Sequence, residues 1–170
     1  MQNNLTIPKG SVFCSKNPMW LGRAINAVQW FWSKDSESTY SHAGIIIDHN
    51  HTTLESLWTV KSQNLLKAYK NDKILIAKPQ TTSSSINIAV QIMINAYKGK
   101  FYPLWRLPLF LFPPSAKINL TKHLTCSELT AHYLNLCGIR HSQFAGTNPD
   151  NLADELKHWK EYEIIFEGIL

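Results

Sequence analysis

Short apolar segments bounded by polar turns recur along the chain and predict β-strands. The segments that fit this pattern are residues 11–14, 42–48, 52–58, 73–78 and 162–166. The second and third segments are joined by the polar turn His49-Asn50-His51, which is typical of a hairpin. We therefore expect these two strands to pair side by side in one sheet.

Apolar residues at helical spacing predict four helices between these strands. The helices are expected over residues 18–32, 84–97, 125–137 and 149–156. Asn17-Pro18 gives the first helix a capping residue and an initial proline, and Gly99 and Gly138 end the second and third. Together the elements predict an α+β fold, with an antiparallel sheet packed against helices, in a single domain over residues 1–170.

The segment 100–122 is rich in proline and aromatic residues and contains no predicted element. A loop of that length within a compact domain usually either has a function or contains an element that was assigned wrongly. We interpret it as a lid or pocket wall. Its apolar part, residues 101–114, either covers an apolar substrate or packs on the core.

The chain carries a formal net charge of +5, but its 17 Lys and Arg residues form no run or stripe. This distribution argues against nucleic-acid binding and allows weak contact with anionic cell wall or lipid. The longest apolar run, residues 104–114, is shorter than the roughly 20 residues of a membrane-spanning helix, and no secretory signal is visible. We expect no integral membrane span, synthesis in the cytoplasm and no cofactor, and the oligomeric state stays open.

The tetrapeptide Thr125-Cys126-Ser127-Glu128 has the pattern of a capping box, with a Glu three residues after a Thr at the start of an apolar-periodic run. It places Cys126 in the first turn of a helix, where the helix dipole favours the thiolate and backbone N–H groups can hold an oxyanion. The alternative is that Cys126 is a small buried apolar residue. Cys14, in a strand, and Cys137, at an apolar helix end, are interpreted as packing residues.

A nucleophilic cysteine needs a base, normally a histidine oriented by a third polar group. Among seven histidines, His42 is the candidate, because it opens an otherwise apolar strand, and Glu55 on the facing strand would orient it. The alternatives are a hydrogen-bonded core histidine and a glutamate that faces solvent. Asp48, His49 and His51 suggest a metal site only weakly, because they lie on a turn and lack a fourth ligand at recognisable spacing.

With these residues in place, the chain resembles the circularly permuted branch of the NlpC-type papain-like cysteine hydrolases, the group called YiiX/YebB-like. Residues 41–45, Ser-His-Ala-Gly-Ile, are similar to the family's Ser-His-x-Gly strand, and residues 126–129, Cys-Ser-Glu-Leu, to its Cys-Ser-Glu-Leu element. Shorter matches occur at residues 9–13, 54–56, 99–102 and 148–152. The chain departs from the family pattern at Ser11, Ser56 and Pro103, none of which belongs to the triad that the family implies.

The resemblance implies a permuted papain-like (NlpC-type) fold with Cys126 as nucleophile, His42 as general base and Glu55 as the orienting residue. It further implies that Tyr102 and Ser127 line the oxyanion or substrate-binding site. The implied activity is hydrolysis of an amide or peptide bond through a thioester acyl-enzyme, with bacterial cell-wall peptides as the first choice of substrate. The alternatives are a lipid acyl hydrolase or acyltransferase with the same triad, and a non-catalytic binding or inhibitory module on the same fold.

Overall fold

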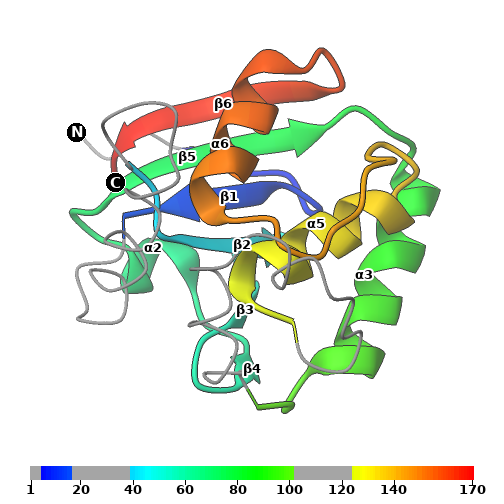
Figure 1. The fold of residues 1–170 in the computed structure, drawn as a ribbon. Coiled ribbons are helices and arrows are strands. Elements are labelled where there is room, and N and C mark those ends of the chain that lie inside the picture. Colours follow the sequence, from blue (N-terminus) through cyan, green and yellow to red (C-terminus); the bar gives the residue numbers. More distant parts are fainter. Residues whose placement is uncertain (1–4, 17–38, 102–123) are drawn as a thin grey trace.

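The computed structural model describes residues 5–16, 39–101 and 124–170. At its centre is a six-stranded sheet with the order β4-β3-β2-β1-β5-β6, in which neighbouring strands are antiparallel (Figure 1). The strands are β1 (Val12–Ser15), β2 (His42–Ile46), β3 (Thr53–Ser56), β4 (Val60–Lys61), β5 (Lys73–Pro79) and β6 (Tyr162–Ile169). The pairing of β2 with β3 confirms the predicted hairpin.

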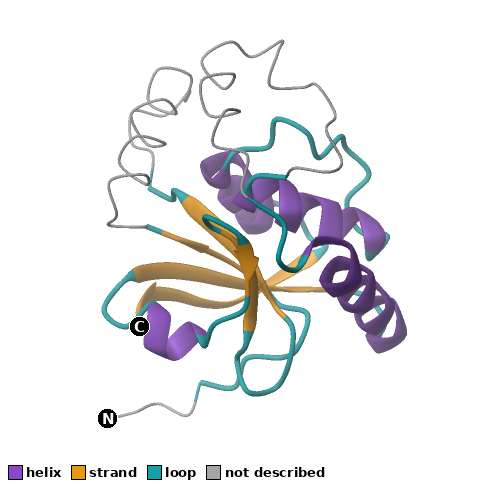
Figure 2. Ribbon diagram, turned by 90° about the horizontal axis from the view of Figure 1, so that it is seen from below, coloured by secondary structure: helices purple, strands orange, loops and turns teal. Residues whose placement is uncertain are grey.

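Four helices lie within the described residues: α2 (Leu65–Ala68), α3 (Ser83–Tyr97), α5 (Cys126–Leu136) and α6 (Pro149–His158). The three longer helices cover one face of the sheet, and the short α2 lies on the other (Figure 2). Each helix is preceded by a capping residue whose side chain accepts a backbone N–H of the first turn, namely Asn64, Thr82, Thr125 and Asn148. None of these four helices is long and apolar enough to cross a membrane.

Two hydrophobic clusters hold the helices against the sheet, one on each face. Because successive side chains of a strand point to opposite faces, neighbouring residues of β5 divide between them: Leu75 joins the larger cluster and Ile76 the smaller. The larger cluster contains buried side chains of α3, α5 and α6, and the smaller contains Leu65 of α2 and Tyr69. Covered on both faces, β2 is buried along its whole length.

The predicted α+β fold, with an antiparallel sheet packed against helices, is confirmed. Some boundaries differ from the prediction. β6 runs to Ile169 because its last residues pair with the start of β5, where Lys73 is the partner of Ile169. β2 ends at Ile46 and β3 at Ser56, two residues earlier than expected in each case, where the chain turns.

Two observed elements were not predicted, β4 and α2. They contain two and four residues, which is too short for a hydrophobic period to show in the sequence. The predicted helix over residues 18–32 and nearly all of the predicted lid lie outside the described residues.

Candidate active site

Cys126 is the first residue of α5, at the tip of the helix, as predicted. The capping box is formed: the Thr125 hydroxyl accepts from the backbone N–H of Glu128 at 3.5 Å, and the Glu128 carboxylate accepts from the backbone N–H of Thr125 at 3.0 Å. The box engages the N–H groups of Thr125 and Glu128 but not those of Cys126 and Ser127. The thiol therefore lies beside two donors at the positive end of a helix dipole.

Further hydrogen bonds fix the first turn of α5 in place. The Ser127 hydroxyl donates to the carbonyl of Thr147 at 2.6 Å, and the Glu128 carboxylate accepts from the backbone N–H of Gly146 at 2.9 Å. The Thr130 hydroxyl donates to the carbonyl of Cys126 at 3.0 Å. Since the Ser127 hydroxyl donates its proton to Thr147, only the backbone N–H of Ser127 is left to donate to a group beside Cys126.

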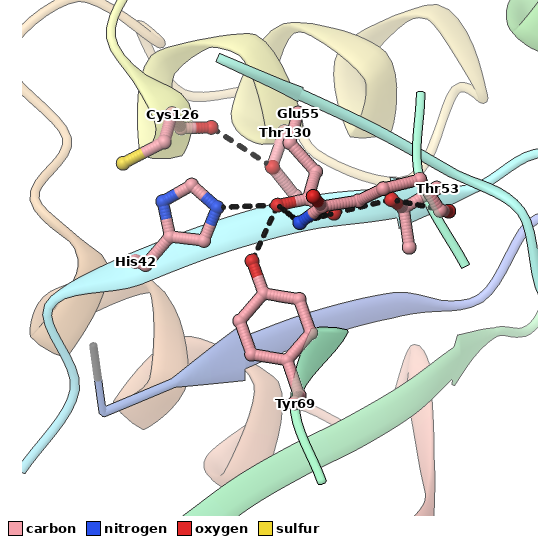
Figure 3. Close-up of polar contacts among 7 residues, drawn as sticks. His42, Thr53, Glu55, Tyr69, Cys126 and Thr130 are labelled. Carbon is pink, nitrogen blue, oxygen red and sulfur yellow. Dashed lines mark hydrogen bonds and ion pairs between the residues drawn. The ribbon is translucent and has the colours of Figure 1, made fainter. Parts of the chain in front are cut away.

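His42 and Glu55 meet across the β2–β3 pair. The register pairs Ile45 with Leu54 and Ile46 with Thr53, so the side chains of His42 and Glu55 lie on one face of the sheet as diagonal neighbours. His42 Nε2 and Glu55 Oε2 are 2.9 Å apart (Figure 3). Glu55 is fully buried, so the alternative of a solvent-facing glutamate is wrong.

Gly44 allows this close packing. A Cβ atom at Gly44 would lie 2.6 Å from the ring of Phe13 and 3.0 Å from Cγ of Glu55. Both side chains belong to the packed sheet and have little room to move. The glycine of the Ser-His-Ala-Gly segment therefore keeps space for the carboxylate that contacts His42.

The Glu55 carboxylate accepts hydrogen bonds from three side chains besides His42. The hydroxyls of Thr53 and Tyr69 each donate to it, and Gln63 Nε2 lies 3.1 and 3.2 Å from its two oxygens. Burial by itself would raise the pKa of Glu55, but the hydrogen bond and charge of His42, with the bonds from Thr53 and Tyr69, hold it below its usual value. Glu55 is therefore a buried carboxylate that stays ionised.

The ring nitrogen of His42 that does not contact Glu55 faces the sulfur of Cys126 (Figure 3). Burial by itself would lower the pKa of His42, but the charge and hydrogen bond of Cys126, together with those of Glu55, raise it to about 10. The Tyr69 ring stacks beside the imidazole at a centroid distance of 6.2 Å. The thiol, the imidazole and the carboxylate are thus arranged in a row.

Sequence reasoning missed the residues that surround Glu55. Thr53, Gln63 and Tyr69 carry no motif, and the last two lie beside or at the end of the short helix α2. The sequence contained only an indirect signal: a carboxylate on a buried strand requires hydrogen-bond donors nearby, but it does not identify them. Tyr102, predicted from the family resemblance, lies outside the described residues.

Cys14 and Cys137 belong to the larger hydrophobic cluster, in agreement with a packing role. The predicted turn at residues 49–51 is present between β2 and β3. There the Asp48 carboxylate accepts two backbone N–H groups, from Asn50 and Thr52, at 2.9 Å each. Asp48 thus stabilises the hairpin turn.

No protein-family model matches the chain, and no curated protein matches it. Among solved structures, the chain is similar to the crystal structure described as metalloprotein YiiX from Escherichia coli O157:H7, DUF1105, with a TM-score of 0.63 and 14% sequence identity. The match covers 96% of this chain and 98% of that chain. At this identity the likeness concerns the fold, so the chain has a YiiX-like fold.

That neighbour is called a metalloprotein in its description. Within residues 5–16, 39–101 and 124–170 of this chain, no group of three or more His, Cys, Asp or Glu residues is placed to hold a metal ion. Glu55 and Cys126 lie at opposite nitrogens of the His42 ring, so the three groups do not converge on one point (Figure 3). The described residues therefore do not fit a metal centre.

Proposed function

We propose that this protein is a cysteine hydrolase that cleaves an amide or peptide bond through a thioester acyl-enzyme. The observation that carries the proposal is the row of Cys126, His42 and Glu55, with the sulfur at the tip of a helix. In this row a nucleophile contacts a base, and the base contacts an orienting carboxylate, which is the arrangement that covalent acyl transfer requires. We further propose that the fold is the circularly permuted NlpC-type form of the papain-like fold, in which the histidine precedes the cysteine.

In the first half of the reaction, the Cys126 thiolate attacks the substrate carbonyl carbon and forms a carbon–sulfur bond. The carbonyl oxygen becomes an oxyanion, which the backbone N–H groups of Cys126 and Ser127 stabilise at the N-terminus of α5. The His42 imidazolium gives its proton to the leaving nitrogen. The carbon–nitrogen bond breaks, the amine departs, and the acyl group remains on sulfur as a thioester.

In the second half, neutral His42 takes a proton from water, and the resulting hydroxide attacks the thioester. The carbon–sulfur bond breaks, the carboxylic acid is released, and the thiolate and the imidazolium are restored. Glu55 keeps its negative charge throughout, holds the ring by the bond at Nε2, and stabilises each imidazolium state.

We propose bacterial cell-wall peptides as the substrate, because the resemblance to the wider papain-like superfamily implies such peptides. The peptide bonds of this polymer present the amide carbonyl that the mechanism requires. The same triad would also attack the ester of a lipid, so the choice between amide and ester depends on what the rest of the site admits.

The test is an assay of the purified protein on a muropeptide digest and, in parallel, on a phospholipid panel, with products identified by mass spectrometry. We expect new muropeptide fragments that are absent with Cys126→Ala and present with the matched control Cys137→Ala. Released fatty acid or lysophospholipid without new muropeptides would replace the peptide substrate with a lipid. No product in either arm that depends on Cys126 would contradict the proposed hydrolase and favour a binding module.

A further inference from the structure

The segment at residues 146–150, which comprises the end of the α5–α6 loop and the first two residues of α6, contacts both halves of the candidate active site. On one side it holds the first turn of α5, because the carbonyl of Thr147 accepts the Ser127 hydroxyl at 2.6 Å and the N–H of Gly146 donates to Glu128 at 2.9 Å. Ser127 directly follows the nucleophile in the chain. This side of the segment therefore sets the position of the Cys126 sulfur.

On its other side, the same segment holds the chain that leads into β2. Asp150, in the first turn of α6, accepts the backbone N–H groups of Thr39 and Tyr40 through one carboxylate oxygen, at 3.0 and 3.3 Å. The ladder between β1 and β2 ends at the pair of Ser15 with His42, so residues 39 and 40 lie beyond it. Asp150 thus fixes the backbone two residues before His42.

The segment is itself anchored by the buried guanidinium of Arg140. Arg140 Nε contacts the two carboxylate oxygens of Glu155 on α6 at 3.0 and 3.1 Å, and a further nitrogen donates to the Thr147 hydroxyl at 3.2 Å. Arg140 also donates to the carbonyls of Ser142 and Gln143 at 3.0 Å each. The one guanidinium thus ties α6, the carbonyls of the loop and Thr147 together through charge-assisted hydrogen bonds, which support the segment in its place.

We propose that Asp150 is a positioning residue, which sets the separation of the Cys126 thiol and the His42 imidazole by tying the start of β2 to the segment that holds the tip of α5. Asp150 acts through two backbone N–H groups and does not itself touch the reacting atoms. The inference rests on the proposed function only for its catalytic consequence. The geometric consequence, a loosened pair of thiol and imidazole, holds whatever the substrate is.

The test compares three variants. Asp150→Ala removes the acceptor and the charge, whereas Asp150→Asn removes the charge and keeps an acceptor oxygen, so the pair of variants isolates the hydrogen bonds. Asp48→Ala is the matched control, because Asp48 also accepts two backbone N–H groups, at the opposite end of β2. The readouts are the NMR titration of His42, assigned by its absence in His42→Ala, and the rate of Cys126 alkylation by iodoacetamide at pH 7.

With Asp150→Ala we expect Cys126 alkylation to slow by about tenfold, and the His42 midpoint to move down from about 10 toward 6.5. Asp150→Asn should stay within about twofold of the wild type, and Asp48→Ala should change the thermal midpoint but neither readout. With a substrate in hand, Asp150→Ala should lower kcat and leave KM unchanged. Should Asp150→Ala fail to fold, Asp150→Glu, which displaces the acceptor by one methylene, is expected to change both readouts in the same direction.

A folded Asp150→Ala or Asp150→Glu with the His42 titration and Cys126 alkylation of the wild type would overturn the positioning role. The positioning role would also be overturned if Asp150→Asn changed both readouts as much as Asp150→Ala does. The charge of Asp150, and not its acceptor oxygen, would then be responsible. If Asp150→Ala changes both readouts as expected but the wild type cleaves no substrate, the proposed function is contradicted and the positioning role is still supported.

Discussion

Helix α5 has a cysteine at each end, and the two cysteines are almost equally buried, with 3% of Cys126 and 4% of Cys137 exposed. Cys126 opens the helix and contacts His42. Cys137 caps the other end, where burial raises the pKa of its thiol to about 11, offset only in part by a hydrogen bond with Tyr133. The end of the helix and the neighbouring side chain, and not burial, therefore separate a candidate nucleophile from a packing residue.

Removal of His42 should abolish the difference between Cys126 and Cys137, and it has the largest expected effect. His42→Ala deletes both the base and the acid of the proposed reaction, so turnover should fall by at least about 10³-fold. The matched control is His132→Ala, because His132 lies on α5 itself, is half-buried, and has no hydrogen-bond partner for Nδ1 among the described residues. Steady-state kinetics on the substrate that the muropeptide and phospholipid assay identifies measure both. Equal losses in the two variants would show that His42 has no special part.

The next effect concerns the carboxylate behind the imidazole. In the wild type the imidazolium persists up to a pKa of about 10, so turnover should decline as the pH rises through that value. Glu55→Gln removes a charge that raises the pKa of His42, so this alkaline limb should move to lower pH, and kcat should fall by about 10 to 100-fold.

The control for that variant is Glu163→Gln, which removes an exposed carboxylate that lies 3.9 Å from Lys78 at the opposite edge of the sheet. Its pH profile should match that of the wild type. An unchanged alkaline limb in Glu55→Gln would mean that the carboxylate does not act on His42.

The smallest expected effect comes from the tyrosine that donates to Glu55. Tyr69→Phe keeps the ring that packs against Phe13 and removes only the hydroxyl. The negative charge of Glu55 is then neutralised by one hydrogen bond fewer and raises the pKa of His42 further. The alkaline limb should therefore shift slightly to higher pH, and kcat should change by about two- to fivefold. Tyr162→Phe, which loses a bond to Glu155, should leave the profile unchanged. A downward shift of the alkaline limb in Tyr69→Phe would contradict this account of the Glu55 environment.

The sequence predicted those parts of the site that depend on local patterns. The capping box lies within four residues, so the position of Cys126 at a helix tip could be inferred without the fold. The pairing of His42 with Glu55 followed from a short hairpin, whose register allows few alternatives once both strands are buried.

What could not be predicted depends on contacts between distant or very short elements. Tyr69 ends a helix of four residues, and its bond to Glu55 exists only because α2 packs on the face of the sheet opposite the larger helices. Asp150 lies 111 residues after Thr39, and no local pattern links the two. Such contacts are set by the tertiary packing, which a periodicity of apolar residues does not determine.

The most direct test of the central claim is the alkylation rate of each cysteine in the folded protein from pH 5 to pH 11, measured by iodoacetamide labelling and peptide mass spectrometry. At pH 7 we expect Cys126 to react at least about tenfold faster than Cys137, and to lose that advantage in His42→Ala. If Cys126 and Cys137 react at similar rates across the range in the wild type, the claim that His42 and the helix tip activate Cys126 is wrong.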